Sequence, residues 1–325
     1  FYSAKHIDAL QEIISTIKAM ILQAAQNCKS DSLALSGGLD SSILASCVGD
    51  QKIKAFALIA KDFSSTDLVY AQLIAKAKNL QLDVITPDTG ELLSAVEQTI
   101  KILKVFNPIE IRNNVVIYLT MKTAKDSGCK SIMTGDGADE LFAGYNFFKR
   151  LSGKELDQDL ERIWNVMHYP SLSISQSIGI SLHTPFLDDK VSEYAKKIPS
   201  NLKIHEENGK KYGKWILRKA FENSLPNSIV WREKYAMQDG SGTSGLTSFF
   251  DTLISDSVFL EKSKHYTDKE KVNLSSKESL YYYEIYRKYF DMPSTLGKSE
   301  SSCPNCSYSV PKNSHFCRMC GSYPI

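Results

Sequence analysis

One segment, residues 33–48, restricts the fold of this chain more than any other. Its apolar start at 33–35 predicts a buried strand, and residues 43–48 are compatible with a helix. Between them stand two glycines, which let a backbone approach an anion, and three hydroxyls: Ser36, Gly37, Gly38, Ser41 and Ser42. The N–H groups and dipole at the start of such a helix favour negative charge by about 0.3–2 kcal/mol. The segment predicts a strand, a phosphate-binding loop and a helix.

The loop is not a Walker loop, because no Gly-x-x-x-x-Gly-Lys-Ser/Thr spacing is present and no lysine follows the glycines. An acid inside it, Asp40, is compatible with phosphates only if Mg²⁺ lies between them. The pattern Ser-Gly-Gly-x-Asp-Ser-Ser resembles the pyrophosphatase loop of the ATP-pyrophosphatase (PP-loop) superfamily, which splits ATP between its α and β phosphates. The alternative is a glycine-rich turn in an ordinary α/β fold.

Strand-like and helical segments alternate through the first 134 residues. Apolar runs predict strands at 33–35, 54–60, 82–85 and 131–134, and helical spacing predicts helices at 7–25, 66–79, 92–105 and 109–127. This alternation implies an α/β fold, a parallel sheet with helices on both faces and ligands at the C-terminal ends of its strands. The later part of the chain is expected to be helical, with the tyrosine-rich stretch 281–290 facing a core rather than stacking on bases.

The amino-acid composition limits which kinds of binding partner are to be expected. A formal charge of +2 over 325 residues provides no overall field for nucleic acid or a membrane, so any such contact is local. No apolar run reaches about 18 residues, and no signal peptide is visible at the N-terminus. We expect a cytoplasmic protein without a membrane partner.

A second segment rich in functional groups, 134–145, follows the strand expected at 131–134. Its carboxylates, Asp136, Asp139 and Glu140, are costly to bury unless a cation such as phosphate-bound Mg²⁺ is present. The alternative is a solvated acidic helix start, which the helix dipole also favours. Because both segments end strands of one sheet, we expect them to face one site, with Asp40 and Asp139 as Mg²⁺ ligands.

The two segments together resemble the synthetase domain of asparagine synthetase and its relative β-lactam synthetase. Three later stretches agree with that family: Pro-Phe-Leu-Asp at 185–188, Lys-Trp-Ile-Leu-Arg-Lys-Ala-Phe at 214–221, and 231–242, which begins Trp-Arg-Glu-Lys. The resemblance covers residues 5–290. It implies an adenine-nucleotide alpha hydrolase-like fold and an ATP-dependent, AMP-forming ligase. In that reaction a carboxylate attacks the α-phosphate, pyrophosphate leaves, and ammonia or another amine takes the acyl group.

The resemblance also implies roles for individual residues. The ATP-binding positions are Leu35, Ser36, Gly37, Gly38, Asp40, Ser41, Ser42, Leu58, Thr134 and Gly135, of which Leu35, Leu58, Thr134 and Gly135 surround the adenosine. Lys234 matches a catalytic lysine beside the α-phosphate, although a surface lysine is the alternative, and residues 237–245 are expected to form a mobile lid. Asp136 matches a catalytic glutamate that helps deprotonate the attacking nitrogen, and is one methylene shorter.

Two departures from the family concern the substrates. Asparagine synthetases carry Glu-x-Arg just before Val-Pro-Phe-Leu-Asp, where this chain has Ser-Leu-His-Thr at 181–184. A histidine does not clamp carboxylates bidentately as arginine does, so recognition of free aspartate is in doubt. The acyl substrate is left open as a small-molecule or carrier-bound carboxylate, and His183 itself is expected to be a core or rim residue. No glutaminase domain is visible in this chain. The nitrogen source is left open between ammonia, another amine, a separate glutaminase subunit and a domain upstream.

The C-terminal tail carries two Cys-x-x-Cys knuckles separated by ten residues: Cys303, Cys306, Cys317 and Cys320. This spacing predicts a zinc ribbon with four thiolates around one structural Zn²⁺, and disulfide bonds are the alternative. We therefore expect two domains, a ligase domain over 1–297 and a zinc ribbon over 298–325. Another function left open is a PP-loop enzyme that adenylates a base carbonyl in tRNA, and an inactive binding module is disfavoured because the site keeps its charged residues.

Overall fold

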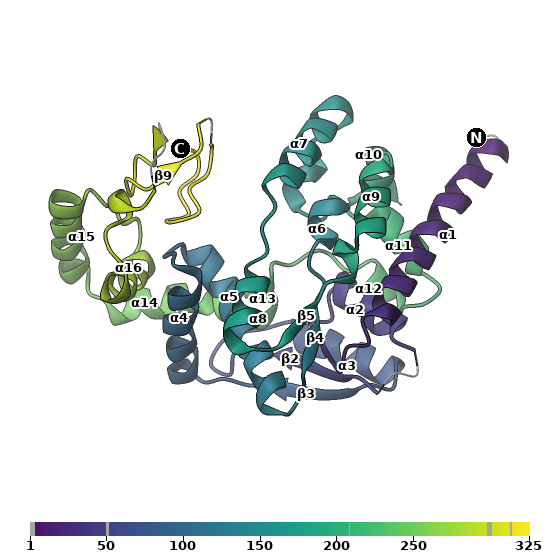
Figure 1. Cartoon of the computed structure of the whole chain (residues 1–325), viewed down its shortest axis with the longest axis horizontal. Helices are drawn as coiled ribbons and strands as arrows, with labels where there is room; N and C mark the ends of the chain where they lie inside the picture. The colour runs from purple at the N-terminus through teal and green to yellow at the C-terminus, as the bar shows by residue number, and fades with distance from the viewer. Residues whose placement is uncertain (1–3, 50–51, 208, 298–300, 313) are drawn as a thin grey trace. The chain divides into compact units, whose positions relative to one another are not determined.

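The computed structural model describes residues 4–49, 52–207, 209–297, 301–312 and 314–325 (Figure 1). By their internal contacts the residues form two units that interleave along the sequence. Unit 1 consists of Phe1–Leu58, Thr66–Ile85 and Thr120–Ala236, and unit 2 of Ile59–Ser65, Thr86–Leu119 and Met237–Ile325. Within the described residues, no helix is long and apolar enough to cross a membrane.

Unit 1 contains the five-stranded parallel sheet and most of the helices that surround this sheet. Its elements are α1 (Ala4–Asn27), β1 (Ser32–Ala34), α2 (Leu39–Cys47), β2 (Lys54–Leu58), α3 (Asp67–Ala77), β3 (Gln81–Ile85), β4 (Ser131–Met133), α6 (Ala138–Leu141), η1 (Asn146–Arg150), α7 (Gly153–Val166), α8 (Pro170–Ile178), β5 (Ser181–His183), η2 (Pro185–Leu187), α9 (Asp189–Lys197), α10 (Ser200–Lys203), β6 (His205–Glu207), β7 (Lys210–Tyr212), α11 (Trp215–Phe221) and α12 (Asn227–Val230). Helix α5 (Pro108–Asp126) begins in unit 2 and ends in unit 1.

The sheet of unit 1 has the strand order β3-β2-β1-β4-β5, and all neighbouring strands are parallel. Helix α2 joins β1 to β2, and α3 joins β2 to β3, whereas α8 precedes β5 on the opposite side of the strand order. Right-handed crossovers therefore place α2 and α3 on one face and α8 on the other. The expected α/β fold with a parallel sheet is confirmed, and the order reverses between β1 and β4, where such folds bind ligands.

One strand of the sheet was not predicted. Strand β5 has only three residues, Ser-Leu-His, and pairs with β4 in the register Met133↔His183. A three-residue strand with a single apolar side chain has too little alternation to show a period of two. The Ser-Leu-His stretch at 181–183 is thus an edge strand of the sheet.

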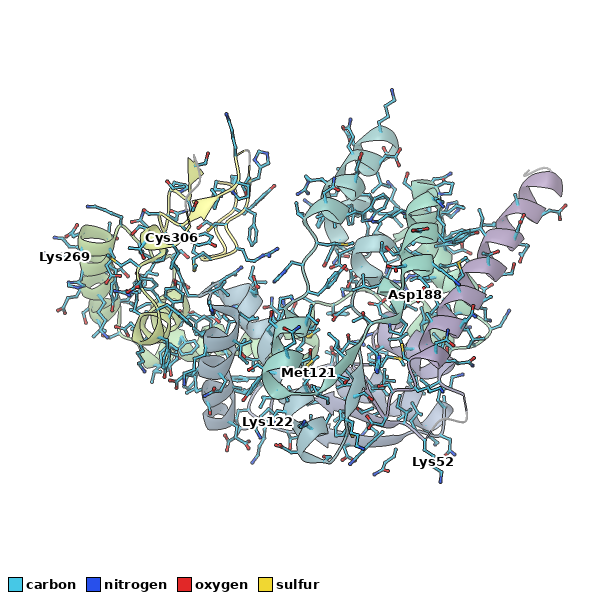
Figure 2. The ribbon with its side chains drawn as sticks, in the orientation of Figure 1. Lys52, Met121, Lys122, Asp188, Lys269 and Cys306 are labelled. Carbon is cyan, nitrogen blue, oxygen red and sulfur yellow. The ribbon has the colours of Figure 1, made fainter. Side chains whose placement is uncertain are left out.

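The core of unit 1 is a continuous apolar cluster that includes side chains of α1, α2, α9 and α11. Helix α1 packs against α2, α9 and α11. Helix α9 is preceded by its N-cap Asp188, labelled in Figure 2, whose side chain accepts hydrogen bonds from the backbone of Lys190 and Val191. The carboxylate that ends Pro-Phe-Leu-Asp is therefore a helix cap, which satisfies backbone donors that the helix leaves unpaired.

Unit 2 is mainly helical. Its elements are α4 (Thr89–Leu103), the first part of α5, α13 (Met237–Ser241), η3 (Thr243–Gly245), α14 (Leu246–Leu253), α15 (Asp256–Glu270), α16 (Lys277–Tyr289), η4 (Pro293–Thr295), β8 (Ser301–Ser302) and β9 (Ser309–Val310). Helix α16 packs on α4 and α14, and its Tyr282, Tyr283 and Tyr286 are fully buried. The prediction that this tyrosine-rich helix faces a core is confirmed.

The expectation of a mobile lid at 237–245 is wrong for its central part. Residues Gly240 to Thr243 are buried, and the Ser241 carbonyl accepts a hydrogen bond of 2.8 Å from the Ala60 backbone. Thr243 donates to the Arg112 carbonyl, and Gly242 takes a left-handed φ of +90° close to the Ser64 carbonyl. The glycines and serines of this segment serve close packing inside unit 2 rather than mobility.

Candidate functional site

The predicted phosphate loop joins β1 to α2 as expected. Gly38 is the N-cap of α2, and the Ser36 hydroxyl accepts a 3.2 Å hydrogen bond from the Gly38 backbone. Gly37 has a φ of +73°, and a Cβ there would collide with Tyr70 and Ala71 at the start of α3. Only glycine fits this position, so the loop is fixed tightly against the next helix of the sheet.

The acidic segment meets this loop at the ends of β1 and β4. A Cβ on Gly135 would stand 2.9 Å from the Asp40 Cβ, so the two backbones approach closely only because residue 135 is glycine. Helix α6 then starts at Ala138 and carries Asp139 in its first turn. The expectation that the two segments face one place is confirmed.

Two lysines and two aspartates form the centre of the site. Lys214 Nζ lies 2.8 and 2.6 Å from the two carboxylate oxygens of Asp40, and 2.6 Å from Asp139 Oδ1. Lys234 Nζ donates a 2.7 Å hydrogen bond to Asp139 Oδ2. Every carboxylate oxygen of Asp40 and Asp139 therefore contacts an ammonium group, and the four formal charges sum to zero. We call these four residues the ion cluster.

Burial and charge act in opposite directions on the pKa values of Asp139 and Lys234. Burial raises the pKa of the Asp139 carboxyl, but the ammonium groups of Lys214 and Lys234 outweigh burial and hold this pKa well below its usual value. Burial likewise lowers the pKa of Lys234, and the charges of Asp139 and Asp40 raise it above its usual value. Asp139 and Lys234 are therefore both charged at neutral pH, as a site for phosphates and a divalent cation requires.

The family model of asparagine synthase matches residues 30–169 and 172–308 of this chain. The chain belongs to the asparagine synthase family. The matched residues contain the phosphate loop, the acidic segment and both lysines of the ion cluster.

Curated relatives agree with this assignment. Asparagine synthetase B of Escherichia coli (strain K12) is 31% identical over 286 residues, which cover 80% of this chain and 50% of that protein. The glutamine-hydrolyzing asparagine synthetase of Gallus gallus is 31% identical over 279 residues, covering 79% and 48%. This chain thus spans about half the length of the curated relatives it matches. Among solved structures, an NH3-dependent NAD synthetase from Campylobacter jejuni aligns with 72% of this chain and 96% of its own at a TM-score of 0.31 and 18% identity.

Lys214 is a candidate site residue that sequence reasoning missed, although the family stretch 214–221 begins with it. It is 3% exposed and has a left-handed φ of +55°, which is uncommon for a lysine. Its backbone N–H donates to the Phe142 carbonyl, which ties it to the acidic segment. A lysine before an apolar helix usually lies in solvent, so only the family match of this stretch signalled a site residue.

The glycine of the Gly-Tyr pair that ends the acidic segment makes room for the ion cluster. A Cβ on Gly144 would overlap Asp139 Oδ1 and Lys214 Cε, and one on Gly213 would overlap the Ala143 carbonyl. Ala143, beside them, has a left-handed φ of +56°. Two non-glycine residues with positive φ, Ala143 and Lys214, thus lie at the ion cluster, and backbones of this kind occur at functional sites.

We predict that Gly144→Ala destabilises unit 1 by about 2–3 kcal/mol, because the added methyl group displaces the buried ion cluster. Scanning calorimetry measures this loss. Gly90→Ala, in the first turn of α4, is the matched control, since its Cβ meets only a capping carboxylate at 3.3 Å. Equal melting temperatures for the two variants would contradict the role given to Gly144.

The predicted catalytic residue Asp136 is held by two hydroxyls. Its Oδ2 accepts hydrogen bonds from Ser171 Oγ and, at 3.0 Å, from Thr134 Oγ1. Burial raises the pKa of Asp136, and these two hydroxyls counteract it in part. Close by in the sequence, Glu140 accepts a 2.5 Å hydrogen bond from the Tyr145 hydroxyl, and burial raises its pKa too.

The remaining predicted ATP-binding residues differ in their exposure. Leu35, Leu58 and Thr134 are buried at or just beyond the ends of β1, β2 and β4. Ser41 donates to the Gly38 carbonyl within the loop. Ser42 is fully buried in α2, and its hydroxyl has no hydrogen-bond partner in the part of the chain that the structure describes. Ser42 thus faces the core, whereas the other loop residues lie around the start of α2.

The four tail cysteines converge in unit 2. Their Sγ atoms all lie within 4.8 Å of one another, and the pairs Cys303–Cys320 and Cys306–Cys317 are each 3.7 Å apart. A tetrahedron with Zn–S bonds of about 2.3 Å has sulfur–sulfur edges of about 3.8 Å, so the four thiols fit a zinc ion. All are free thiols, which argues against the disulfide alternative. The second knuckle lies beyond the residues that the family model matches.

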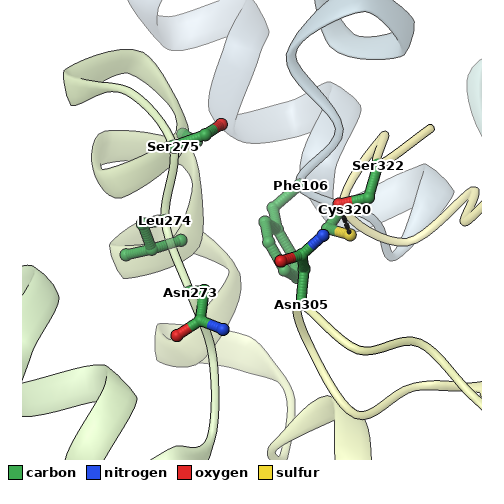
Figure 3. A pocket seen from close by; sticks show the side chains of 8 residues that line it. Phe106, Asn273, Leu274, Ser275, Asn305, Cys320 and Ser322 are labelled. Carbon is green, nitrogen blue, oxygen red and sulfur yellow. Dashed lines mark hydrogen bonds between the residues drawn. The ribbon is translucent and has the colours of Figure 1, made fainter. Parts of the chain in front are cut away.

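A small pocket beside the second knuckle is distinct from the ion cluster. Figure 3 shows it between the loop at Asn273 to Ser275 and the knuckle residues Asn305, Cys320 and Ser322, with Phe106 at its wall. None of the predicted nucleotide-binding residues lines it. The pocket therefore belongs to the packing of the ribbon rather than to the candidate active site.

Proposed function

We propose that this chain is an ATP-dependent, AMP-forming ligase, which adenylates a carboxylate with release of pyrophosphate and transfers the acyl group to ammonia or another amine. The observation that carries the proposal is the ion cluster at the carboxyl ends of β1 and β4, beside the phosphate loop. Membership of the asparagine synthase family supports the same chemistry.

In the proposal, the loop and the ion cluster act on different parts of ATP. In the proposal, the start of α2 binds the pyrophosphate half of ATP, while Leu35, Leu58, Thr134 and Gly135 surround the adenosine. The carboxylates of Asp40 and Asp139 suit Mg²⁺, which would neutralise charge on the leaving pyrophosphate. Because all four of their oxygens contact lysines, Mg²⁺ would compete with the ammonium groups for these oxygens, and we propose that one ammonium moves to a phosphate when Mg²⁺ binds with ATP.

Lys234 is the ammonium best suited to move. Its side chain is 30% exposed, against 3% for Lys214, and it holds a single carboxylate oxygen. We therefore give Lys234 the role of stabilising negative charge at the α-phosphate in the transition state. Lys214 stays as the fixed partner of both carboxylates. Asp136 is proposed as the base toward the attacking nitrogen, and its hydroxyl partners would orient it.

The acyl substrate of the proposal is a carboxylate other than free aspartate. Strand β5 lies directly beside the acidic segment, since the Thr134 backbone N–H donates to the His183 carbonyl. The histidine is half-buried, and burial lowers its pKa, so its ring is largely neutral at pH 7 and a weak partner for a second carboxylate. The nitrogen donor is ammonia, another amine or a separate glutaminase subunit. The proposed division into a ligase domain over 1–297 and a zinc ribbon over 298–325 stays a prediction.

Pyrophosphate release from Mg-ATP tests the proposal. The purified chain is given a panel of carboxylates with ammonium in one series, bulk tRNA in a second, and product masses are measured in both. We expect amide products in the first series, and Asp40→Asn to lower the rate on the order of 100-fold or more. Asp126→Asn, an exposed partner of Lys122, is the control. A mass change confined to tRNA would replace the ligase proposal with RNA modification, and full activity of Asp40→Asn would refute the proposed site.

A further inference from the structure

Arg232, two residues before Lys234, reaches the phosphate loop from outside. Its Nη1 donates to the Gly37 carbonyl at 3.2 Å, and its Nη2 donates to Asp67 Oδ1 at 2.8 Å. The guanidinium carbon lies 3.8 Å from the centre of the Tyr70 ring. The side chains of Arg232 and Asp67 are only 7% and 11% exposed, so the guanidinium is enclosed between the loop and the start of α3.

The backbone around Arg232 is also fixed, by a second buried arginine. Arg218 Nη1 donates to the carbonyls of Val230 and, at 3.0 Å, of Arg232, while its Nε donates to the Gly213 carbonyl at 2.9 Å. Gly213 precedes Lys214, so this arginine joins the segments that carry the two lysines of the ion cluster. Hydrogen bonds thus connect the phosphate loop to Arg232, and they connect Arg232 through Arg218 to the residue before Lys214 of the ion cluster.

The hydrogen bond from Arg232 to the Gly37 carbonyl fixes the direction of the peptide group between Gly37 and Gly38. A carbonyl that accepts from a guanidinium cannot at the same time turn its negative end toward a phosphate. The N–H of that same peptide, on Gly38, is opposed to the carbonyl and donates to Ser36 Oγ. Gly37 has no side chain that could hold this peptide, and the hydrogen bonds to Arg232 and Ser36 hold it instead.

We infer that Arg232, anchored by Asp67, is a positioning residue that holds the Gly37 carbonyl away from the phosphates and so sets the affinity for the pyrophosphate half of ATP. The inference rests on the proposed function. Arg232 acts through the loop rather than by touching the nucleotide. A lysine at this place cannot serve Gly37 and Asp67 together, because it lacks the planar fork of the guanidinium.

The test compares two nucleotides by calorimetry, Mg-α,β-methylene-ATP, which cannot be cleaved between its α and β phosphates, and AMP. Arg232→Lys, Arg232→Met and Asp67→Asn are each expected to weaken binding of the methylene analogue tenfold or more, and of AMP less than twofold. Arg162→Lys, an exposed partner of Asp159, is the matched control and should bind both ligands as the wild type does.

The outcomes separate the inference from the proposed function. Equal losses for AMP and the methylene analogue indicate a general effect on folding and overturn the inference, as does unchanged affinity in all three variants. If the wild-type chain binds neither nucleotide, the proposed function fails and the inference fails with it. Melting temperatures of Arg232→Lys and Asp67→Asn, the more conservative changes, show that the tested variants are folded.

Discussion

Replacing Lys214 with methionine is expected to lower the melting temperature of unit 1 by about 6–12 °C, which corresponds to about 3 kcal/mol. The substitution keeps a flexible apolar stem but removes the ammonium that contacts both oxygens of Asp40 and one of Asp139. Two largely buried carboxylates then face each other, and of the two ammonium groups in the ion cluster Lys234 alone remains. We expect binding of Mg-ATP to be lost as well, because the carboxylates no longer keep their positions.

The control for this variant is Lys122→Met, in which an exposed pair with Asp126 is broken (Figure 2). Exposed ion pairs contribute little to the free energy of unfolding, so the melting temperature of Lys122→Met should stay within about 2 °C of that of the wild type. The double variant Asp40→Asn/Lys214→Met should regain part of the loss, since it no longer buries an unpaired charge. If Lys214→Met melts with the wild type, the ion cluster does not stabilise unit 1.

The pH dependence of the same variant follows from the depressed pKa of Asp139. A carboxyl whose pKa is lower in the folded state contributes stability above its unfolded pKa of about 4, and loses it as the pH falls through the folded value. The difference in stability between wild type and Lys214→Met should therefore persist from pH 8 to about pH 4 and shrink below it.

The sequence could predict what depends on local pattern. Apolar runs located four strands, the Gly-Gly pair located the tight loop between β1 and α2, and the cysteine spacing located a cluster of four thiols. It could not predict β5, which is too short to show a period, or the role of Lys214, whose partner Asp40 lies 174 residues away. No local pattern reveals such a pairing, because it depends on how β1, β4 and the hairpin of β6 and β7 meet.

The segment at 237–245 shows a second limit. Glycine and serine are frequent both in mobile loops and in places where backbones pack closely, and composition does not distinguish the two. Here Gly245 faces Phe63, Gly242 faces the Ser64 carbonyl, and both partners come from the short insert Ile59–Ser65 of unit 2. Whether segment 237–245 is buried or mobile depends on the residues that it packs against, and these lie far away in the sequence.

Removal of metal from the four-cysteine cluster is expected to have the largest effect on unit 2. Both knuckles are bonded to the rest of the unit: the Asn305 carbonyl accepts from the Asn273 backbone at 2.6 Å, and the Met319 carbonyl accepts from the Phe106 backbone at 3.0 Å. Phe106 in turn packs edge-on against Tyr283 of α16, with ring centres 4.8 Å apart. Loss of the ribbon therefore removes partners from the buried tyrosine core.

We expect one equivalent of zinc in the purified chain by elemental analysis. Chelation should release it together with four newly reactive thiols, and the tyrosine fluorescence of α16 should change. Structural zinc contributes about 10–16 kcal/mol apparent in small domains, so the ribbon should not fold without it.

Cys306→Ser should abolish zinc retention, whereas Cys28→Ser, which lies in unit 1, should keep it. Since Lys234 and Asp139 belong to unit 1, loss of zinc need not disturb the ion cluster. Full zinc retention by Cys306→Ser would show that these cysteines do not form a four-thiolate site.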